Sequence, residues 1–253
     1  MSEQHIPFAR GFPTDWPIRP GNVLQLDWRA MTRNKIDLWI PEAVRSRSHG
    51  TLLMILHEEA CYRFERIGND SWRHTFEKPG VLRLEGITRP IVNGIEMSLT
   101  IANCSADAWQ AVSAGVCVQF HAAPDFRDPE RQRTFYIGGG TLRTLAQSRV
   151  STSGDGVCLF YGAGSSPECP PADVSFIGIH SADGHYVAAT WWEGAQGVGG
   201  NCHPATMCIH SNPGFGDIPA GAEVTRRGRL YLMPGTPEDA WQRYREDTLA
   251  GSR

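Results

Sequence analysis

The sequence has few of the features that mark membrane, nucleic-acid-binding or secreted proteins. None of its apolar stretches approaches the ~20 residues that a membrane-spanning helix needs. Its 24 Lys and Arg are balanced by 27 Asp and Glu without a basic run, which favours neither nucleic acid nor an anionic membrane surface as a partner. Residues Met1 to Trp16 contain no apolar segment of the kind found in signal peptides. We therefore expect a cytoplasmic protein with no nucleic-acid partner and no membrane partner.

Several short motifs are also missing. The seven cysteines are an odd number without a CxxC pair, which fits reduced thiols in a cytoplasm, most of them small core residues. The glycine runs 138–140 and 197–200 lack the Lys-Ser/Thr of a phosphate-binding loop, so we interpret both as turns or loops. No serine lies in a Gly-x-Ser-x-Gly context, so a serine hydrolase is not expected.

What the sequence does contain is a series of short segments typical of β-strands. In one of them, Ile95, Met97, Leu99 and Ile101 alternate with polar residues, as a strand with one wet face requires. The other candidates are residues 23–28, 36–40, 51–56, 81–87, 112–121, 175–180, 185–192, 207–210 and 222–233. Between Arg127 and Pro171 the periodicity is weak, and we expect long loops there. The predicted fold is all-β: one large antiparallel β-sandwich spanning residues 1–253, with long loops and a C-terminal helix.

Two local signals are specific. Asp183-Gly184 lies between two candidate strands and predicts a tight hairpin turn, because glycine accepts a positive φ. The C-terminal helix is predicted over about residues 237–249: Thr236 can cap it, Pro237 suits its first turn, and two acidic residues follow at its positive end. Its apolar side chains are expected to dock on the sheet; they are Trp241, Tyr244 and Leu249.

Two neighbouring segments carry a resemblance to a known family. Residues 94–105 read GIEMSLTIANCS, and residues 117–126 read CVQFHAAPDF. Together they resemble the mid-chain pattern of galactose-mutarotase-like β-sandwich proteins, in which one strand precedes another that delivers a histidine near a proline and a phenylalanine. The resemblance implies that His121 occupies the site-histidine position of those sugar epimerases. It also implies the large sandwich fold that serves carbohydrate lyases and hydrolases.

The segment from Trp191 to His210 is the strongest candidate for an active site, because it combines aromatic, carboxylate, imidazole and glycine residues. Glu193 follows two tryptophans at a predicted strand end, where apolar surroundings would favour its protonated form and suit a general acid. The alternative is a solvent-facing glutamate at a sheet edge. The predicted acid–base residues are His121, Glu193, His203 and His210.

Three residues are predicted to bind substrate. Trp192 would stack on a sugar ring, and Asn201 would add to the affinity for the sugar. Arg143 lacks acidic neighbours in sequence, so its guanidinium could grip a carboxylate or a pair of sugar hydroxyls.

A metal site is a separate hypothesis. His203 and His210 could bind zinc or iron together with a distant ligand such as His121 or Glu193, provided that the intervening loop folds back. No cofactor is otherwise predicted.

Three functions remain open. The leading hypothesis is a carbohydrate-active enzyme that acts on a small sugar or glycoside by Glu/His acid–base chemistry, as a lyase, a hydrolase or an epimerase. The alternatives are a non-catalytic carbohydrate-binding sandwich and a metal-dependent enzyme with a His/Glu site. Exposed aromatic side chains would also suit the interface of a homo-oligomer.

Overall fold

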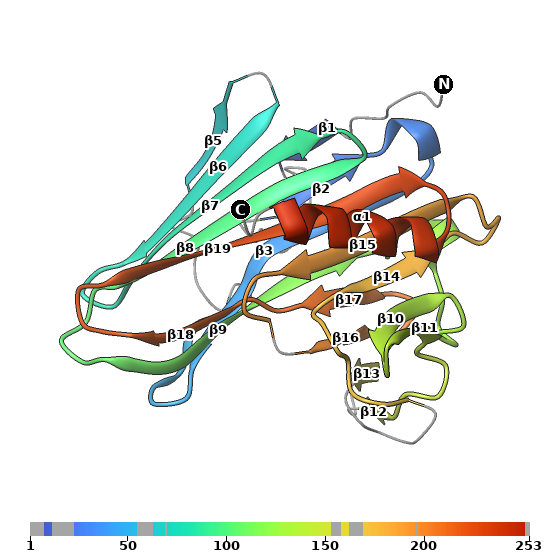
Figure 1. Ribbon diagram of the computed structural model, residues 1–253. Helices are drawn as coiled ribbons and strands as arrows, with labels where there is room; N and C mark the ends of the chain where they lie inside the picture. The colour runs from blue at the N-terminus through green and yellow to red at the C-terminus, as the bar shows by residue number, and fades with distance from the viewer. Residues whose placement is uncertain are drawn as a thin grey trace.

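The computed structural model describes residues 8–11, 23–54, 63–68, 70–152, 158–161, 169–195 and 197–250. These residues form two large antiparallel sheets that pack face to face, with one α-helix on the far side of one sheet (Figure 1). The predicted all-β sandwich is therefore confirmed. None of the helical segments in the described residues is both long enough and apolar enough to span a bilayer.

The first sheet, which we call sheet A, has ten strands. Its main path runs β1 (Phe8–Gly11), β2 (Val23–Asp27), β3 (Lys35–Ser46), β9 (Trp109–Gln119), β17 (Cys208–Ser211), β16 (Val198–Asn201), β13 (Cys158–Tyr161) and β12 (Val150–Thr152). Strand β4 (Gly50–Met54) pairs with β3, and β18 (Gly214–Ile218) pairs with β9. Strand β9 is thus central, because β3 flanks one of its edges and β17 and β18 share the other.

The second sheet, sheet B, has nine strands. They run in the order β11 (Thr141–Thr144), β10 (Thr134–Gly138), β14 (Ile177–His180), β15 (Tyr186–Trp192), β19 (Glu223–Pro234), β8 (Gly94–Asn103), β7 (Leu82–Ile91), β6 (Ser71–Lys78) and β5 (Arg63–Ile67). The Asp183-Gly184 turn joins β14 to β15 as predicted, with Gly184 at φ +76°.

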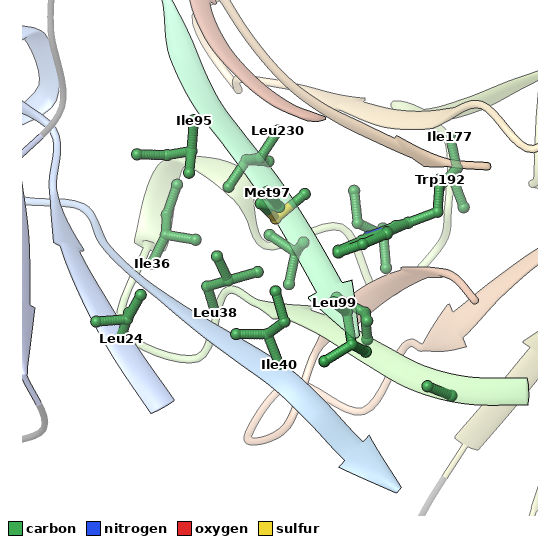
Figure 2. Close-up of a cluster of buried hydrophobic side chains, with 14 of the residues drawn as sticks. Leu24, Ile36, Leu38, Ile40, Ile95, Met97, Leu99, Ile177, Trp192 and Leu230 are labelled. Carbon is green, nitrogen blue, oxygen red and sulfur yellow. The ribbon is translucent and has the colours of Figure 1, made fainter. Parts of the chain in front are cut away.

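The main core lies between the two sheets. Ile36 and Leu38 of β3 face Met97 and Leu99 of β8 in one continuous apolar cluster (Figure 2). The alternation predicted for 95–101 is confirmed, because Ile95, Met97, Leu99 and Ile101 are all buried at the inner face. Apolar burial of this kind contributes roughly 25 cal/mol per Å² and is the main force that holds the two sheets together.

The C-terminal helix α1 (Pro237–Ala250) covers the outer face of sheet B next to β14 and β15 (Figure 1). Thr236 and Asp239 cap its first turn reciprocally, since each backbone N–H bonds to the other residue's side chain. Trp241 and Tyr244 pack against Phe176, as predicted. Leu249 was also expected to dock on the sheet, but it is 70% exposed.

Two segments that are expected from the sequence to form loops contain strands. The region 127–171 contains β10, whose five residues Thr134–Gly138 are all buried, so it shows no polar alternation. The glycine run 197–200 forms most of β16, because Gly199 and Gly200 pair with His210 and Ile209 of β17. The run 138–140 does form a turn, with Gly139 and Gly140 at positive φ.

The buried histidine His74 of β6 makes folding sensitive to acid. Its ring is fully buried opposite Gly86, where an added Cβ would lie only 2.0 Å from the ring. Burial lowers the pKa of His74 to about 4, against the opposing effect of a hydrogen bond with the Ile40 backbone. The unfolded chain takes up this proton near its ordinary pKa of 6.5, so stability is complete above pH 6.5 and falls as the pH drops towards 4.

We therefore expect the native chain to lose about 3 kcal/mol of unfolding free energy through His74 between pH 6.5 and pH 4. Urea unfolding at several pH values measures this slope. The His74→Leu variant should show a shallower slope over the same interval, whatever its absolute stability. An unchanged slope would show that other groups cause the acid sensitivity.

Candidate active site

The side of sheet A that faces away from the core carries most of the chemistry. Side chains of β2, β3, β9 and β17 alternate between the core and this side, which we call the outer face of sheet A. Val23, Trp39, Cys117 and Cys208 form a small buried cluster on it. The strand register aligns Asp37 with Gln119, and Trp39 with Cys117. Polar and sulfur-containing residues of distant segments therefore meet on one surface.

His121 and Asp37 form a pair on this face. His121 follows the end of β9, and its Nε2 lies 3.6 Å from Oδ2 of Asp37. The histidine side chain is 23% exposed, whereas that of Asp37 is only 1% exposed. Gln25 donates a hydrogen bond of 3.2 Å to the other carboxylate oxygen of Asp37. Burial raises the pKa of Asp37, while Gln25 and His121 favour its charged form.

A second group on the same face consists of two thiols and an imidazole. Cys208 and His210 are two residues apart on β17, and Cys117 lies opposite His210 on β9. The Cys208 Sγ is 3.2 Å from Nε2 of His210. A hydrogen bond from Cys117, together with the nearby His210, holds the pKa of Cys208 well below the usual range of a thiol. Burial raises the pKa of Cys117. We call these three residues the thiol–imidazole cluster.

A cleft of about 880 Å³ opens beside this cluster. Glu42, Arg45, Gly199, His210, Asn212 and Arg226 are among the residues that line it. Oε2 of Glu42 lies 4.0 Å from Nε2 of His210. The pairing of β3 with β9 shifts register between Trp39 and Ala43, and both Glu42 and Ala43 line the cleft there. Its volume is within the range of small-molecule sites.

The electrostatics of Glu42 and His210 are coupled. Burial raises the pKa of Glu42, and the neighbouring imidazole of His210 opposes this effect. Burial alone would lower the pKa of His210, but the Cys208 thiol and the Glu42 carboxylate outweigh it and raise that pKa.

His203 and Asn201 shape the turn between β16 and β17. The Asn201 side chain accepts a hydrogen bond from the backbone of His203 and donates one to Thr206. His203 Nδ1 accepts the backbone N–H of Ala205. These contacts explain both residues as parts of a turn, and neither lines the cleft next to His210.

The side chains of Glu193 and Arg143 also form hydrogen bonds with backbone groups. Glu193 is exposed at the end of β15, and its carboxylate accepts the backbone N–H of Arg227 at 2.9 Å. Arg143 on β11 donates to the Gly138 carbonyl at 2.7 Å. The structure thus favours the solvent-facing interpretation of Glu193, although β15 is an interior strand, and Arg143 bonds within its own hairpin.

Trp192 belongs to the main core. Its side chain is 1% exposed and points into the cluster between the sheets (Figure 2). The ring packs against Gly228 on the neighbouring strand, where an added Cβ would lie 2.4 Å from it. The stacking role predicted for Trp192 is therefore corrected, since the ring offers no exposed face to a sugar.

The four predicted acid–base residues do not meet in one cleft. Of the four, His210 lines the cleft and His121 lies further along the same face of sheet A, beyond the end of β9. The partners of these two histidines were not predicted from the sequence; they are Asp37, Glu42, Cys117 and Cys208. His203 does not join His210 in one group of metal-ligating side chains, since His203 bonds within its own turn and, among the described residues, the thiols of Cys117 and Cys208 lie close to His210.

Comparisons with known proteins identify the fold. No protein-family model matches the sequence, and no curated protein is similar to it in sequence. The crystal structure of the Slr1438 protein from Synechocystis sp. PCC 6803 matches 90% of this chain and 96% of its own, with a TM-score of 0.54 and 9% identity.

Two further solved structures that are similar to this chain have titles that name a type of protein. A galactose mutarotase-like protein from Clostridium acetobutylicum matches 85% of this chain and 94% of its own, with a TM-score of 0.44 and 9% identity. A GalM/aldose epimerase homologue from C. elegans matches 84% and 95%, with a TM-score of 0.42 and 6% identity. The chain thus shares the sandwich fold of the Slr1438 protein, and its likeness to the galactose mutarotase-like structures is weak and partial.

Proposed function

We propose that this protein is a carbohydrate-active enzyme that interconverts forms of a small sugar by acid–base catalysis, with His121 as the proton-transferring group. The observation that carries this proposal is the partly exposed His121 imidazole held 3.6 Å from the buried carboxyl group of Asp37. A side chain that moves protons must reach the substrate, and a buried carboxylate behind it can fix its orientation.

Among the four predicted acid–base residues, His121 fits this role best. Glu193 and His203 hold backbone N–H groups, and His210 faces two thiols. The resemblance of residues 94–105 and 117–126 to galactose-mutarotase-like proteins supports the same choice, because it assigns His121 to their site-histidine position. Asp37 is then a positioning residue, itself held by Gln25.

The chemistry needs few groups. An aldose ring opens when its ring oxygen gains a proton and its anomeric hydroxyl loses one, and it closes again by the reverse transfers. His121 can carry out one of these transfers, since an imidazole both donates and accepts protons near neutral pH. No step in this sequence changes the oxidation state of the sugar.

The native chain should therefore accelerate anomer exchange in at least one aldose. NMR exchange spectroscopy on a panel of pentoses, hexoses and hexose 6-phosphates measures the rate with and without protein. The matched control is His185→Gln, which changes an exposed histidine next to the β14–β15 turn of the other sheet and should leave the rate unchanged. Binding of an aldose without acceleration would support the non-catalytic sandwich, and the absence of both would overturn a sugar function.

A further inference from the structure

The thiol–imidazole cluster has the composition and spacing of a metal site. The Sγ atoms of Cys117 and Cys208 and a ring nitrogen of His210 all lie within 4.8 Å of one another. In a tetrahedral zinc site, sulfur and nitrogen ligands are separated by roughly 3.3–3.8 Å. The Cys208 Sγ and the His210 Nε2 are 3.2 Å apart, which is already close to this spacing.

The strands hold these ligands without help from a loop. Cys208 and His210 share one face of β17 because strand side chains alternate. Cys117 stands directly opposite His210 on β9, in the centre of sheet A. Both thiols are buried, at 3% and 5% exposure. A ligand set on paired central strands is rigid, which suits a structural or catalytic ion.

We propose that Cys117, Cys208 and His210 bind one divalent, thiolate-preferring metal ion of the zinc class, with the fourth coordination position directed towards the cleft. Thiolate and imidazole ligands favour zinc over the oxygen-seeking ions magnesium and calcium. Two thiolates and one divalent cation also carry no net charge together, so the cluster can stay buried at a smaller desolvation cost than a lone ion.

The surroundings of the cluster fit an open fourth position. Gly199 pairs with His210 on the adjacent strand and adds no side chain over it, and both residues line the cleft. The Glu42 carboxylate lies 4.0 Å from the His210 nitrogen on the cleft side. A site with three protein ligands and one open position is the usual arrangement of catalytic zinc. The proposal does not depend on His121 or on the sugar reaction.

Cobalt substitution tests the proposal on the full native chain. The reduced protein is freed of metal with a chelator and then titrated with Co²⁺. We expect saturation at one ion per chain, a thiolate-to-cobalt charge-transfer band and the intense visible bands of tetrahedral cobalt. Zn²⁺ should displace the cobalt and raise the melting temperature. The absence of a thiolate-to-cobalt band in the folded, reduced native chain would overturn the site.

Variants locate the ion. Cys208→Ser and Cys117→Ser should each lower cobalt affinity by about 100-fold or more. Cys104→Ser is the matched control, because Cys104 is an exposed thiol outside the cluster. The cobalt affinity of this variant should equal that of the native chain. Equal losses in all three variants would overturn the assignment. If a cluster variant does not fold, the spectrum of the native chain still decides.

Oxidation is the competing fate of two adjacent thiols. Peptide mass analysis of the native chain, isolated without added oxidant and left unreduced, distinguishes the two states. We expect no peptide that joins Cys117 to Cys208, together with bound zinc in elemental analysis. A quantitative cross-linked peptide would overturn the proposal, because a disulfide leaves no thiolates for an ion.

Discussion

Replacing His121 by glutamine is expected to lower kcat for anomer exchange by about 10²–10⁴-fold, the usual contribution of a positioned acid–base group. Glutamine keeps a polar side chain next to Asp37 but cannot take up a proton in the working pH range. KM should change little, because the variant loses a transfer made in the transition state. Progress curves at several sugar concentrations separate the two constants.

Asp37 offers an independent check of the same pair. The Asp37→Asn variant keeps the size of the side chain and an oxygen for the hydrogen bond from Gln25, but removes the charge next to His121. Because Asp37 acts through His121, we expect kcat to fall and KM to stay constant. A rise in KM alone would indicate that Asp37 only supports the shape of the surface. Native turnover in His121→Gln would remove His121 from the mechanism.

Replacing Trp192 by alanine is expected to lower the free energy of unfolding by about 3–5 kcal/mol, the range for a large aromatic side chain lost from a core. The neighbouring residue across the strands is Gly228, which has no side chain to move into the space. The cavity therefore collapses poorly, and the cost should lie near the upper end of the range. Urea unfolding monitored by far-ultraviolet circular dichroism measures it.

Two results accompany this loss if Trp192 is a core residue. The Trp192→Phe variant should lose much less stability, because a ring still fills most of the space. The folded Trp192→Ala protein should keep the native KM for its sugar. A large increase in KM with near-native stability would restore the stacking role that the sequence suggested.

Most of the fold could be predicted because apolar alternation reports directly which face of a strand is buried. Residues 95–101 follow this rule and form most of β8. The rule fails where a strand is buried on both faces, as in β10, or where it contains almost no side chains, as in the Val198-Gly199-Gly200 part of β16. In such segments the pairing with neighbouring strands determines the structure, and the local sequence does not indicate which strands those are.

The site was harder to predict, because its residues are joined by strand register. His121 and His210 were identified as single residues, but Asp37 and Cys117 reach them only through the pairing of β3, β9 and β17. One signal was available in the sequence: Asp37 alternates with apolar residues that face the core, while its same-face neighbour is Trp39. A charged residue on a strand with two apolar faces indicates a buried, partnered carboxylate.

The central position of β9 also determines when the protein can become functional during its synthesis. Its partner β3 leaves the ribosome early, but β17 follows far later in the chain, and β19 must still pair with β8 to complete the other sheet. Pairings over such long sequence separations form slowly, because the chain loses conformational entropy on closing the loop before the strand contacts stabilise it. Until then the edge of β9 is open to other strands. The nascent chain is therefore open to aggregation at this edge until β17 and β18 have emerged, as expected for an all-β topology of this size.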